Sequence, residues 1–339
     1  MKMPIYLRAH TVLFRDRLRP NGNSNKPEKY PEYALILDCE THLDAGQALI
    51  LCVYQICRRN GEGLYVCVEE GLVFADEATA NEQAIIREYS QTHKPHVAEG
   101  YPNRLRVLSR SEFVEHVFYK LAYEADALVC GFNLPFDLSR LAVDARKARK
   151  NKAWSLILSQ YKDSKTGRLH ENRFRARIII EPKDSKAAFI RFAGRNGTKR
   201  SEGPRKLGRF LDLRQIAWAL LNESHKLDTA CDRFGVPGKL DHSPSGQVTP
   251  EEIEYCRQDV RASVALLNAE LAHFQLHPID LLPERAISAA SIGKAYLDAM
   301  GLIPPAEKFR FPPFVLGIAM QAYFGGRAEC RIRNTSVPV

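Results

Sequence analysis

The sequence lacks several features that would place it in a membrane, secreted or disulfide-bonded class. It has no run of about 18 apolar residues, so we expect no transmembrane helix. Its N-terminus, MKMPIYLRAHTVLFRDRLRP, is too charged for a signal peptide. Its eight cysteines form no CxxC pair, and several lie inside apolar runs, which indicates reduced thiols rather than disulfides or a zinc site. A cytoplasmic protein is therefore the default expectation.

Two further absences limit the organisation and the chemistry. No internal repeat is evident, and no serine or cysteine nucleophile pattern stands out. At 339 residues the chain is long enough for one large domain, or for one domain and part of another, each with its own core.

Positive charge is concentrated in one segment. Residues 146–209 contain 20 Lys and Arg against 5 Asp and Glu, a net charge of +15, and since the whole chain carries +9 the remainder carries −6. Such a block is commonly only a solvated face. Its size and its neighbouring aromatic residues Phe174, Phe189 and Phe192 favour a polyanion partner instead, with nucleic acid as the natural candidate.

The hydrophobic pattern predicts an α/β layered domain. Apolar runs at 34–40, 48–54 and 63–68 with short spacers predict neighbouring antiparallel strands, and a strand at 127–131 is followed by a helix from 133 to about 150. The other expected elements are helices at 111–125, 227–234, 249–274, 284–300 and 313–323, a basic hairpin at 173–180 and 187–192, and strands at 210–213 and 327–333.

The stretch LILDCETHLD, residues 35–44, places two acids at the end of an expected buried strand. Side chains alternate along a strand, so Asp38 and Glu40 face the same side while Cys39 faces the other side and packs. Two neighbouring carboxylates repel each other unless a positive charge lies between them. The doublet is therefore either a solvated strand end or half of a metal site.

Two later motifs favour the metal site. Asn133 and Asp137 stand four residues apart at a helix entry, and Tyr255 and Asp259 stand four apart within the helix that Thr249 is expected to cap. Each pair alone is weak evidence, because such pairs are common on exposed helix surfaces. Together, four carboxylates from three segments can bind two Mg²⁺ or Mn²⁺ ions, which is the arrangement used in two-metal phosphodiester hydrolysis.

At these residues the sequence resembles a known family. LDCET, NLPFD and YCRQD, in this order, look like the three motifs of DEDD-superfamily 3′-to-5′ exonucleases. They resemble the Tyr-bearing branch, since the sister branch has His where this chain has Glu254. Thr41, the run TPEE at 249–252 and the run YFGG at 323–326 narrow the resemblance to the proofreading domain of family B DNA polymerases, especially the protein-primed type.

The resemblance implies a role for individual residues. Asp38, Glu40, Asp137 and Asp259 would be catalytic metal ligands for two Mg²⁺ or Mn²⁺ ions, and Tyr255 would orient the attacking water. Asp212 is interpreted as structural or peripheral. The residues that would contact the substrate are Thr41, Asn133, Phe136, Lys239, Tyr323, Gly325, Gly326 and Arg327. Phe136 can also be a core residue, and around Lys239 the family places a Tyr where this chain has KLDH.

The resemblance also implies a fold and a division of the chain. The expected fold is RNase H-like, a mixed five-stranded sheet flanked by helices, with an inserted basic β-hairpin and a small helical connector. The expected parts are an irregular lead-in at 1–32, an exonuclease domain at 33–275 with an insert at about 150–208, and a connector at 276–339 that begins a polymerase palm region.

The expected function follows from these implications. It is metal-dependent 3′-to-5′ removal of nucleotides from single-stranded DNA or a primer 3′ end, within a family B polymerase-like protein. The polymerase motifs DxxSLYP and YxDTD are absent, so no polymerase activity is expected from this chain alone. Further partners would be a downstream polymerase domain or a priming protein. The alternatives are an inactive single-strand-binding module and an RNA-trimming exonuclease of the same superfamily.

Overall fold

A computed structural model describes residues 30–148, 153–184, 186–193, 207–238, 240, 242–302 and 311–322. The larger of two compact units runs from Gly22 to Tyr296 and holds the elements from β1 to η2. α9 falls in the second unit, and α7 crosses the limit between the two. The expected lead-in up to residue 29 and the expected strand at 327–333 lie outside the described residues.

The central element is a six-stranded sheet with the strand order β12-β5-β1-β2-β3-β4. β2 is antiparallel to both β1 and β3, whereas β5 is parallel to β1 and to β12, and β4 is parallel to β3. Its strands are β1 (Tyr33–Thr41), β2 (Leu49–Arg59), β3 (Tyr65–Phe74), β4 (Arg106–Ser109), β5 (Leu128–Gly131) and β12 (Arg209–Asp212).

The strand order confirms the predicted α/β class and is compatible with an RNase H-like fold. The expected antiparallel neighbours at the start of the domain are β1, β2 and β3. The sheet has one strand more than the five expected, because β4 pairs with β3 at the outer edge. The pattern did not predict β4, because its four residues, RVLS, hold only two apolar side chains and form no apolar run.

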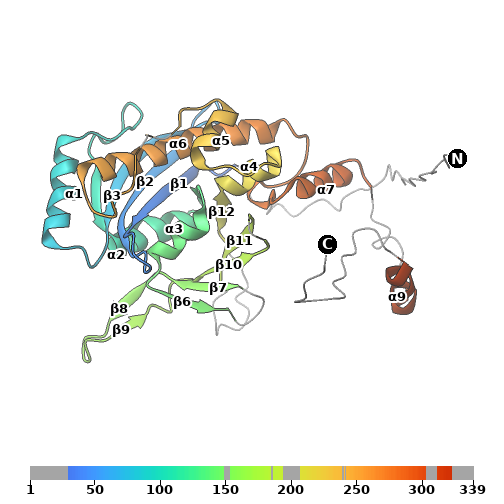
Figure 1. Cartoon of the computed structure of the whole chain (residues 1–339), viewed down its shortest axis with the longest axis horizontal. Helices are drawn as coiled ribbons and strands as arrows, with labels where there is room; N and C mark the ends of the chain where they lie inside the picture. The colour runs from blue at the N-terminus through green and yellow to red at the C-terminus, as the bar shows by residue number, and fades with distance from the viewer. Residues whose placement is uncertain are drawn as a thin grey trace, which may run out of the picture. The chain divides into compact units, whose positions relative to one another are not determined.

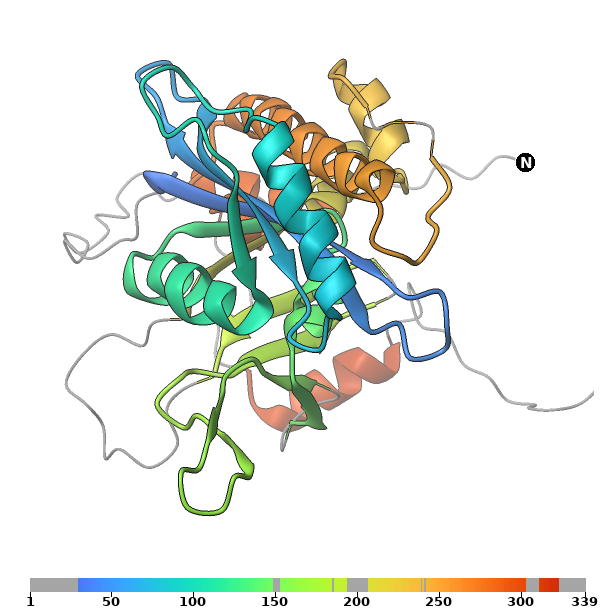
Figure 2. The same ribbon diagram turned by 90° about the vertical axis from the view of Figure 1, so that its left-hand side faces the viewer.

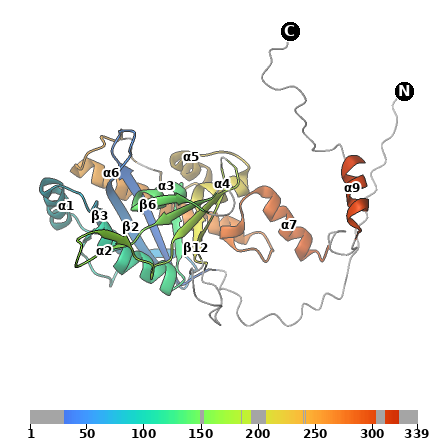
Figure 3. The same ribbon diagram turned by 90° about the horizontal axis from the view of Figure 1, so that it is seen from below.

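Helices cover both faces of this sheet, and Figures 1 and 3 show α6 running across β1 and β2. The helices are α1 (Ala80–Thr92), α2 (Arg110–Phe113), the π-helix η1 (Val114–Glu124), α3 (Leu134–Leu141), α4 (Leu213–Leu221), α5 (Leu227–Phe234), α6 (Pro250–Gln275), the 3₁₀ helix η2 (Pro283–Arg285), α7 (Ala289–Ala299) and α9 (Pro313–Ala322). No helix in the described ranges combines the length and the apolar character that a membrane span requires.

Several helix ends differ from the sequence prediction. The helix expected from 133 to about 150 ends at Leu141, because residues from Asp144 onward pair as a strand of a second sheet. The helix expected from Ser111 starts at Arg110, where Ser109 caps it and Glu112 completes the capping box. A serine and an acid one turn apart occur twice in this stretch, so the pattern could not decide between the two starts.

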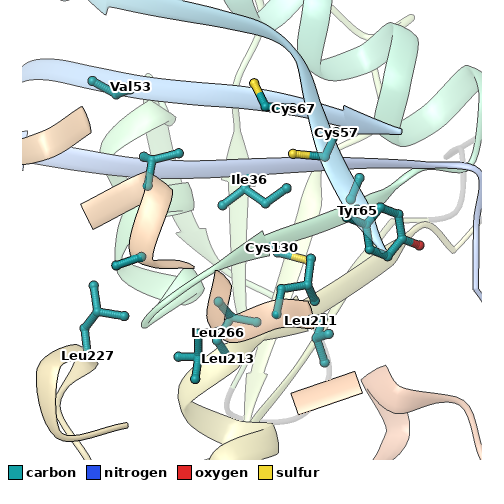
Figure 4. Packing of buried hydrophobic residues seen from close by; sticks show 14 of the residues in the cluster. Ile36, Val53, Cys57, Tyr65, Cys67, Cys130, Leu211, Leu213, Leu227 and Leu266 are labelled. Atoms are coloured by element: carbon teal, nitrogen blue, oxygen red, sulfur yellow. The ribbon is translucent and has the colours of Figure 1, made fainter. Parts of the chain in front are cut away.

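Alternation along β1 sends its side chains into two separate cores. Ala34 and Ile36 pack with residues of α4, α5 and α6, as Figure 4 shows for Ile36, Leu213, Leu227 and Leu266. Leu35, Leu37 and Cys39 pack on the opposite face with residues of η1 and α3. Asp38 and Glu40 therefore belong to the face that α6 covers.

The basic segment forms more than the expected hairpin. The predicted pairing of two strands is present as β10 (Ile178–Pro182) with β11 (Ala188–Phe192), but the first strand begins only at Ile178. The other strands are β6 (Asp144–Lys147), β7 (Trp154–Ile157), β8 (Gln160–Lys162) and β9 (Leu169–Glu171). β6 and β7 complete a four-stranded sheet with β10 and β11, in the order β11-β10-β7-β6. β8 and β9 form a separate hairpin that projects from the larger unit in Figures 1 and 2.

Phe192 corrects one expectation about this segment. We counted it with Phe174 and Phe189 among the aromatic neighbours that favour a polyanion partner. Phe192 is instead fully buried, with its ring 5.2 Å from that of Phe210 and 5.1 Å from that of Tyr123, measured between centroids. An aromatic residue at the end of a strand is as suitable for a core as for a binding surface, and burial cannot be read from charge density alone.

Candidate metal centre

The end of β1 supplies two carboxylates to the candidate centre. Asp38 and Glu40 are both partly exposed, and they lie on the face of the sheet that carries α6. Cys39 points to the opposite face, as predicted, where it is buried and its thiol lies 3.7 Å from the backbone oxygen of Asp137. β1 therefore places Asp38 and Glu40 beside α6, a helix that follows much later in the sequence.

α3 supplies Asp137 from its first turn, where the helix N-terminus favours negative charge. The side chain is 2% exposed, and its Oδ2 has no hydrogen-bond partner among the residues that the structure describes. Gly131 at the end of β5 makes room for it: a Cβ there would lie 3.1 Å from Oδ2 of Asp137 and 3.0 Å from the backbone oxygen of Leu37.

Burial raises the pKa of Asp137 well above its usual range, and the nearby charge of Asp38 raises it further. The ionised carboxylate is therefore costly at this position without a compensating positive charge. A buried acid with an unsatisfied oxygen is the environment that a divalent cation would stabilise.

α6 supplies Tyr255 and Asp259, which lie four residues apart and are hydrogen-bonded to each other. Both side chains are buried. Burial raises the pKa of Tyr255, and the charges of Asp259, Glu40 and Asp38 raise it further. The phenol, which is neutral at physiological pH even without this shift, can orient a water molecule but cannot act as a base.

Cys256 connects α6 to β1. Its Sγ lies 3.6 Å from the side-chain Oδ2 of Asp38 and 3.6 Å from the backbone oxygen of the same residue. Among the described residues, the potential ligand atoms of Asp38, Glu40 and Cys256 all lie within 4.8 Å of one another. Burial raises the pKa of the Cys256 thiol, so the anionic donors of this group are the two carboxylates.

The donor set fits a hard divalent cation. Carboxylate oxygen suits Mg²⁺ and Mn²⁺, whereas a protonated thiol is a poor ligand for either. Asp137 and Asp259 do not belong to the 4.8 Å group, but Asp38 acts on the pKa of Asp137 and Asp259 acts on that of Tyr255. The structure thus brings Asp38, Glu40, Asp137, Tyr255 and Asp259 into one electrostatic cluster.

Asn133 stands at the entry of α3 in the left-handed conformation, with φ of 75°. Its side chain makes no capping hydrogen bond to the helix, so capping does not use its amide. Its backbone N–H donates to Oδ1 of Asp212 at 3.0 Å, and the same oxygen caps α4 by accepting from the N–H of Arg214 at 3.0 Å. Asp212, which we interpreted as structural or peripheral, fixes the backbone at the start of the second motif.

The remaining predicted substrate contacts divide into two groups. Thr41 is partly exposed and follows an irregularity in the β1–β2 pairing, and Phe136 is partly buried beneath Arg140, whose guanidinium carbon lies 4.8 Å from the ring centroid. Five other predicted contacts lie outside the described residues: Lys239, Tyr323, Gly325, Gly326 and Arg327.

Two residues beside Tyr255 were missed by the sequence analysis. The ring of His242 lies 4.9 Å from that of Tyr255, and its Nε2 lies 3.0 Å from Oε2 of Glu252. Glu252 stands where a capping box with Thr249 would place it, but its carboxylate binds His242 and Ser245 while Thr249 alone caps the helix. The sequence KLDH contained a signal for this contact, because its last residue, His242, supplies a second aromatic ring shortly before the tyrosine motif.

The fold and the site define an α/β protein with a group of partly exposed and buried carboxylates that fits divalent cations. No protein-family model matches the chain, and no curated protein matches it. Among solved structures, it is similar to Phi29 DNA polymerase in complex with primer-template DNA and incoming nucleotides, with a TM-score of 0.39 and 15% sequence identity. The match covers 88% of this chain and 40% of that one. At this level of similarity the comparison adds nothing to the geometry described above.

Proposed function

We propose that the chain is a metal-dependent 3′-to-5′ exonuclease of the proofreading type, acting on single-stranded or frayed DNA ends. One observation supports the proposal: carboxylates from three elements act on one another, since Asp38, Glu40 and Asp259 raise the pKa of Tyr255 on α6 and Asp38 on β1 raises that of Asp137 on α3. Acids that are merely solvated have no reason to gather from three elements that lie far apart in the sequence.

The four carboxylates would hold two Mg²⁺ or Mn²⁺ ions. When bound, such ions lower the pKa of the attacking water and stabilise the leaving oxygen of the phosphodiester. The chain itself does the positioning. Tyr255 is neutral and hydrogen-bonded to Asp259, so its hydroxyl can orient the water.

Residues around the second motif would hold the terminal nucleotide. The amide of Asn133 is not used for capping, and Thr41 is partly exposed at the end of the strand that bears the acids. Phe136 can stack on a base, and Arg140, which lies over the same ring, donates to the backbone oxygen of Gln47 at 2.6 Å. That hydrogen bond joins α3 to the loop after β1.

The test is digestion of a 5′-labelled oligonucleotide in Mg²⁺ and in EDTA. The wild type should produce a ladder of shortened, still labelled products only when the metal is present. The double variant Asp38→Ala with Glu40→Ala should produce none. A control that removes two exposed acids, Glu62→Ala with Glu99→Ala, matches the change in charge and should digest like the wild type.

Three outcomes would contradict or redirect the proposal. Metal-dependent shortening that survives in Asp38→Ala with Glu40→Ala would remove these acids from the mechanism. Binding of DNA without shortening in any divalent metal would favour a binding module. Faster digestion of a matched RNA would favour an RNA-trimming enzyme, since the 2′-hydroxyl is the feature that distinguishes the two substrates.

A further inference from the structure

The basic insert contains a cavity of 830 Å³ that lies among β6, β7, β8 and β9 and the segment that follows them. Two aromatic side chains line it with much of their surface in solvent: Tyr161 is 52% exposed and Phe174 is 86% exposed. Large apolar side chains are seldom left so accessible in pairs without a partner. We call this feature the insert cavity.

Positive charge dominates the segment around the insert cavity. The cavity itself is lined by Arg146, Arg173 and His170 and by two acids, Asp144 and Glu171. Across residues 144–177 there are 11 Lys and Arg against 3 Asp and Glu. The segment therefore carries a formal charge of +8 on few residues, which favours an anionic partner.

The few acids of this segment are neutralised locally. Asp144 pairs with Arg146 at 2.7 Å, and Glu171 pairs with Arg177 at 2.5 Å. The third, Asp163, accepts backbone hydrogen bonds from Lys165 at 2.9 Å and Thr166 at 2.7 Å within the β8–β9 turn. Arg173, by contrast, lines the cavity with no ion pair among the described residues, so its positive charge is available to an anion.

Exposed rings beside an excess of cations match the chemistry of single-stranded nucleic acid. A single strand offers both phosphates and unpaired base faces, whereas a duplex hides its base faces and an acidic peptide has none. The cavity volume lies in the range of ordinary ligand sites and is sufficient for a short stretch of strand.

We propose that the insert cavity is an accessory binding site for single-stranded nucleic acid, in which Tyr161 and Phe174 stack on bases and Arg173 contacts a phosphate. The proposal rests on the proposed function in one respect, since the bound strand would be the one whose end reaches the acids. The insert cavity and the acids are close in the sequence, because β6 starts at Asp144, only three residues after the end of α3, the helix that carries Asp137.

The test measures binding of a fluorescein-labelled oligothymidylate to the full chain in EDTA, where no metal bridges the acids and the strand. The double variant Tyr161→Ala with Phe174→Ala should bind about tenfold more weakly or worse, since one stacked base alone contributes roughly five- to a hundredfold. A control that truncates two exposed side chains outside the insert, Tyr101→Ala with Leu276→Ala, should bind within about twofold of the wild type.

Two further variants separate stacking and phosphate contact from loss of structure. Tyr161→Phe with Phe174→Tyr keeps both rings and should retain wild-type affinity. Arg173→Ala should lower the slope of log affinity against log salt by about 0.7, the value for one phosphate contact to a single strand. Equal affinity of the wild type and the Tyr161→Ala, Phe174→Ala protein would overturn the proposal. So would competition by poly-glutamate or by duplex DNA as strong as that by unlabelled oligothymidylate, because either would point to a partner of another class.

The same assays distinguish this proposal from the proposed function. If the Asp38→Ala, Glu40→Ala protein still digests DNA while Tyr161→Ala with Phe174→Ala weakens binding, the assignment of the catalytic acids fails and the accessory site stands. If digestion is lost on removal of the acids but the ring variants bind like the wild type, the accessory site fails alone.

Discussion

Arg257 on α6 donates two hydrogen bonds to the carboxylate of Glu70 on β3, from Nε at 2.8 Å and from Nη2 at 3.2 Å. The two residues are 1% and 0% exposed, so the pair is shielded from solvent. Arg257 also donates to the hydroxyl of Tyr89 on α1 and to the backbone oxygen of Lys94. It lies between Tyr255 and Asp259 in the sequence, so the ion pair fixes α6 at the turn that enters the metal centre.

Removing one partner of this pair should be strongly destabilising. Arg257→Met leaves Glu70 buried without its counter-ion, which typically costs about 3 to 5 kcal/mol. The free energy of unfolding in urea should fall by that order, and activity should fall with it because α6 loses its anchor on β3.

A double substitution provides the control for that prediction. Arg257→Met with Glu70→Leu removes both charges, so it should recover most of the stability lost in the single variant. If Arg257→Met were as stable as the wild type, the ion pair between Arg257 and Glu70 would not be the contact that fixes α6 on β3.

Tyr255→Phe should slow cleavage without weakening metal binding. The variant keeps the ring beside His242 but removes the hydroxyl that orients the water, which we expect to lower the single-turnover rate about 10- to 100-fold. The Mg²⁺ concentration for half-maximal rate should stay the same, because no carboxylate is lost. A variant that needs much more Mg²⁺ at an unchanged maximal rate would contradict this role.

Gly131→Ala should disturb the position of Asp137. The new Cβ would lie 3.1 Å from Oδ2 of Asp137 and 3.0 Å from the backbone oxygen of Leu37, so one of them must move. We expect a loss of about 1 to 3 kcal/mol in stability and a higher Mg²⁺ requirement. Gly61→Ala is the matched control, since a Cβ at Gly61 meets nothing within 4 Å. Equal Mg²⁺ requirements in both variants would exclude the crowding of Asp137.

Asp212 should make stability depend on pH. Burial raises its pKa to about 6, so the folded state binds more protons than the unfolded state between about pH 4 and pH 6. The contribution to stability is complete below about pH 4 and is lost as pH rises through about 6.

Asp212→Asn keeps the oxygen that accepts from Asn133 and Arg214 but removes the titration. Relative to the wild type, the variant should therefore be more stable at pH 8 than at pH 4.5, by on the order of 2 kcal/mol. Urea unfolding at the two pH values measures this, with the exposed Glu88→Gln as the control. A difference of the opposite sign would show that Asp212 is stabilised as the anion.

Local spacing explains what the sequence predicted well. A period of two placed Asp38 and Glu40 on one side of a strand, and a spacing of four placed Tyr255 and Asp259 on one side of a helix. Thr249 and Pro250 marked the start of α6 because their preference depends on neighbouring residues only. The α/β class followed from the same local patterns.

Features that depend on distant contacts could not be predicted in this way. Cys256 meets Asp38 across 218 positions of sequence, and Arg257 meets Glu70 across 187. In the motif YCRQD both residues looked like spacers between Tyr255 and Asp259. Phe192 illustrates the same limit, since its burial depends on Phe118 and Phe210 rather than on its basic neighbours.

The buried state of both sides of α6 has an evolutionary consequence. Each residue advances a helix by about 100°, so Tyr255 and Arg257 lie on nearly opposite sides and each meets a different partner. A substitution in this turn changes one side chain and its contacts. An insertion or deletion of a single codon would instead rotate every later side chain of the helix by about 100°, so that all of them would lose their partners together. Genes encoding related chains should therefore keep the length of this turn constant, and length changes should collect in the turns of the basic insert.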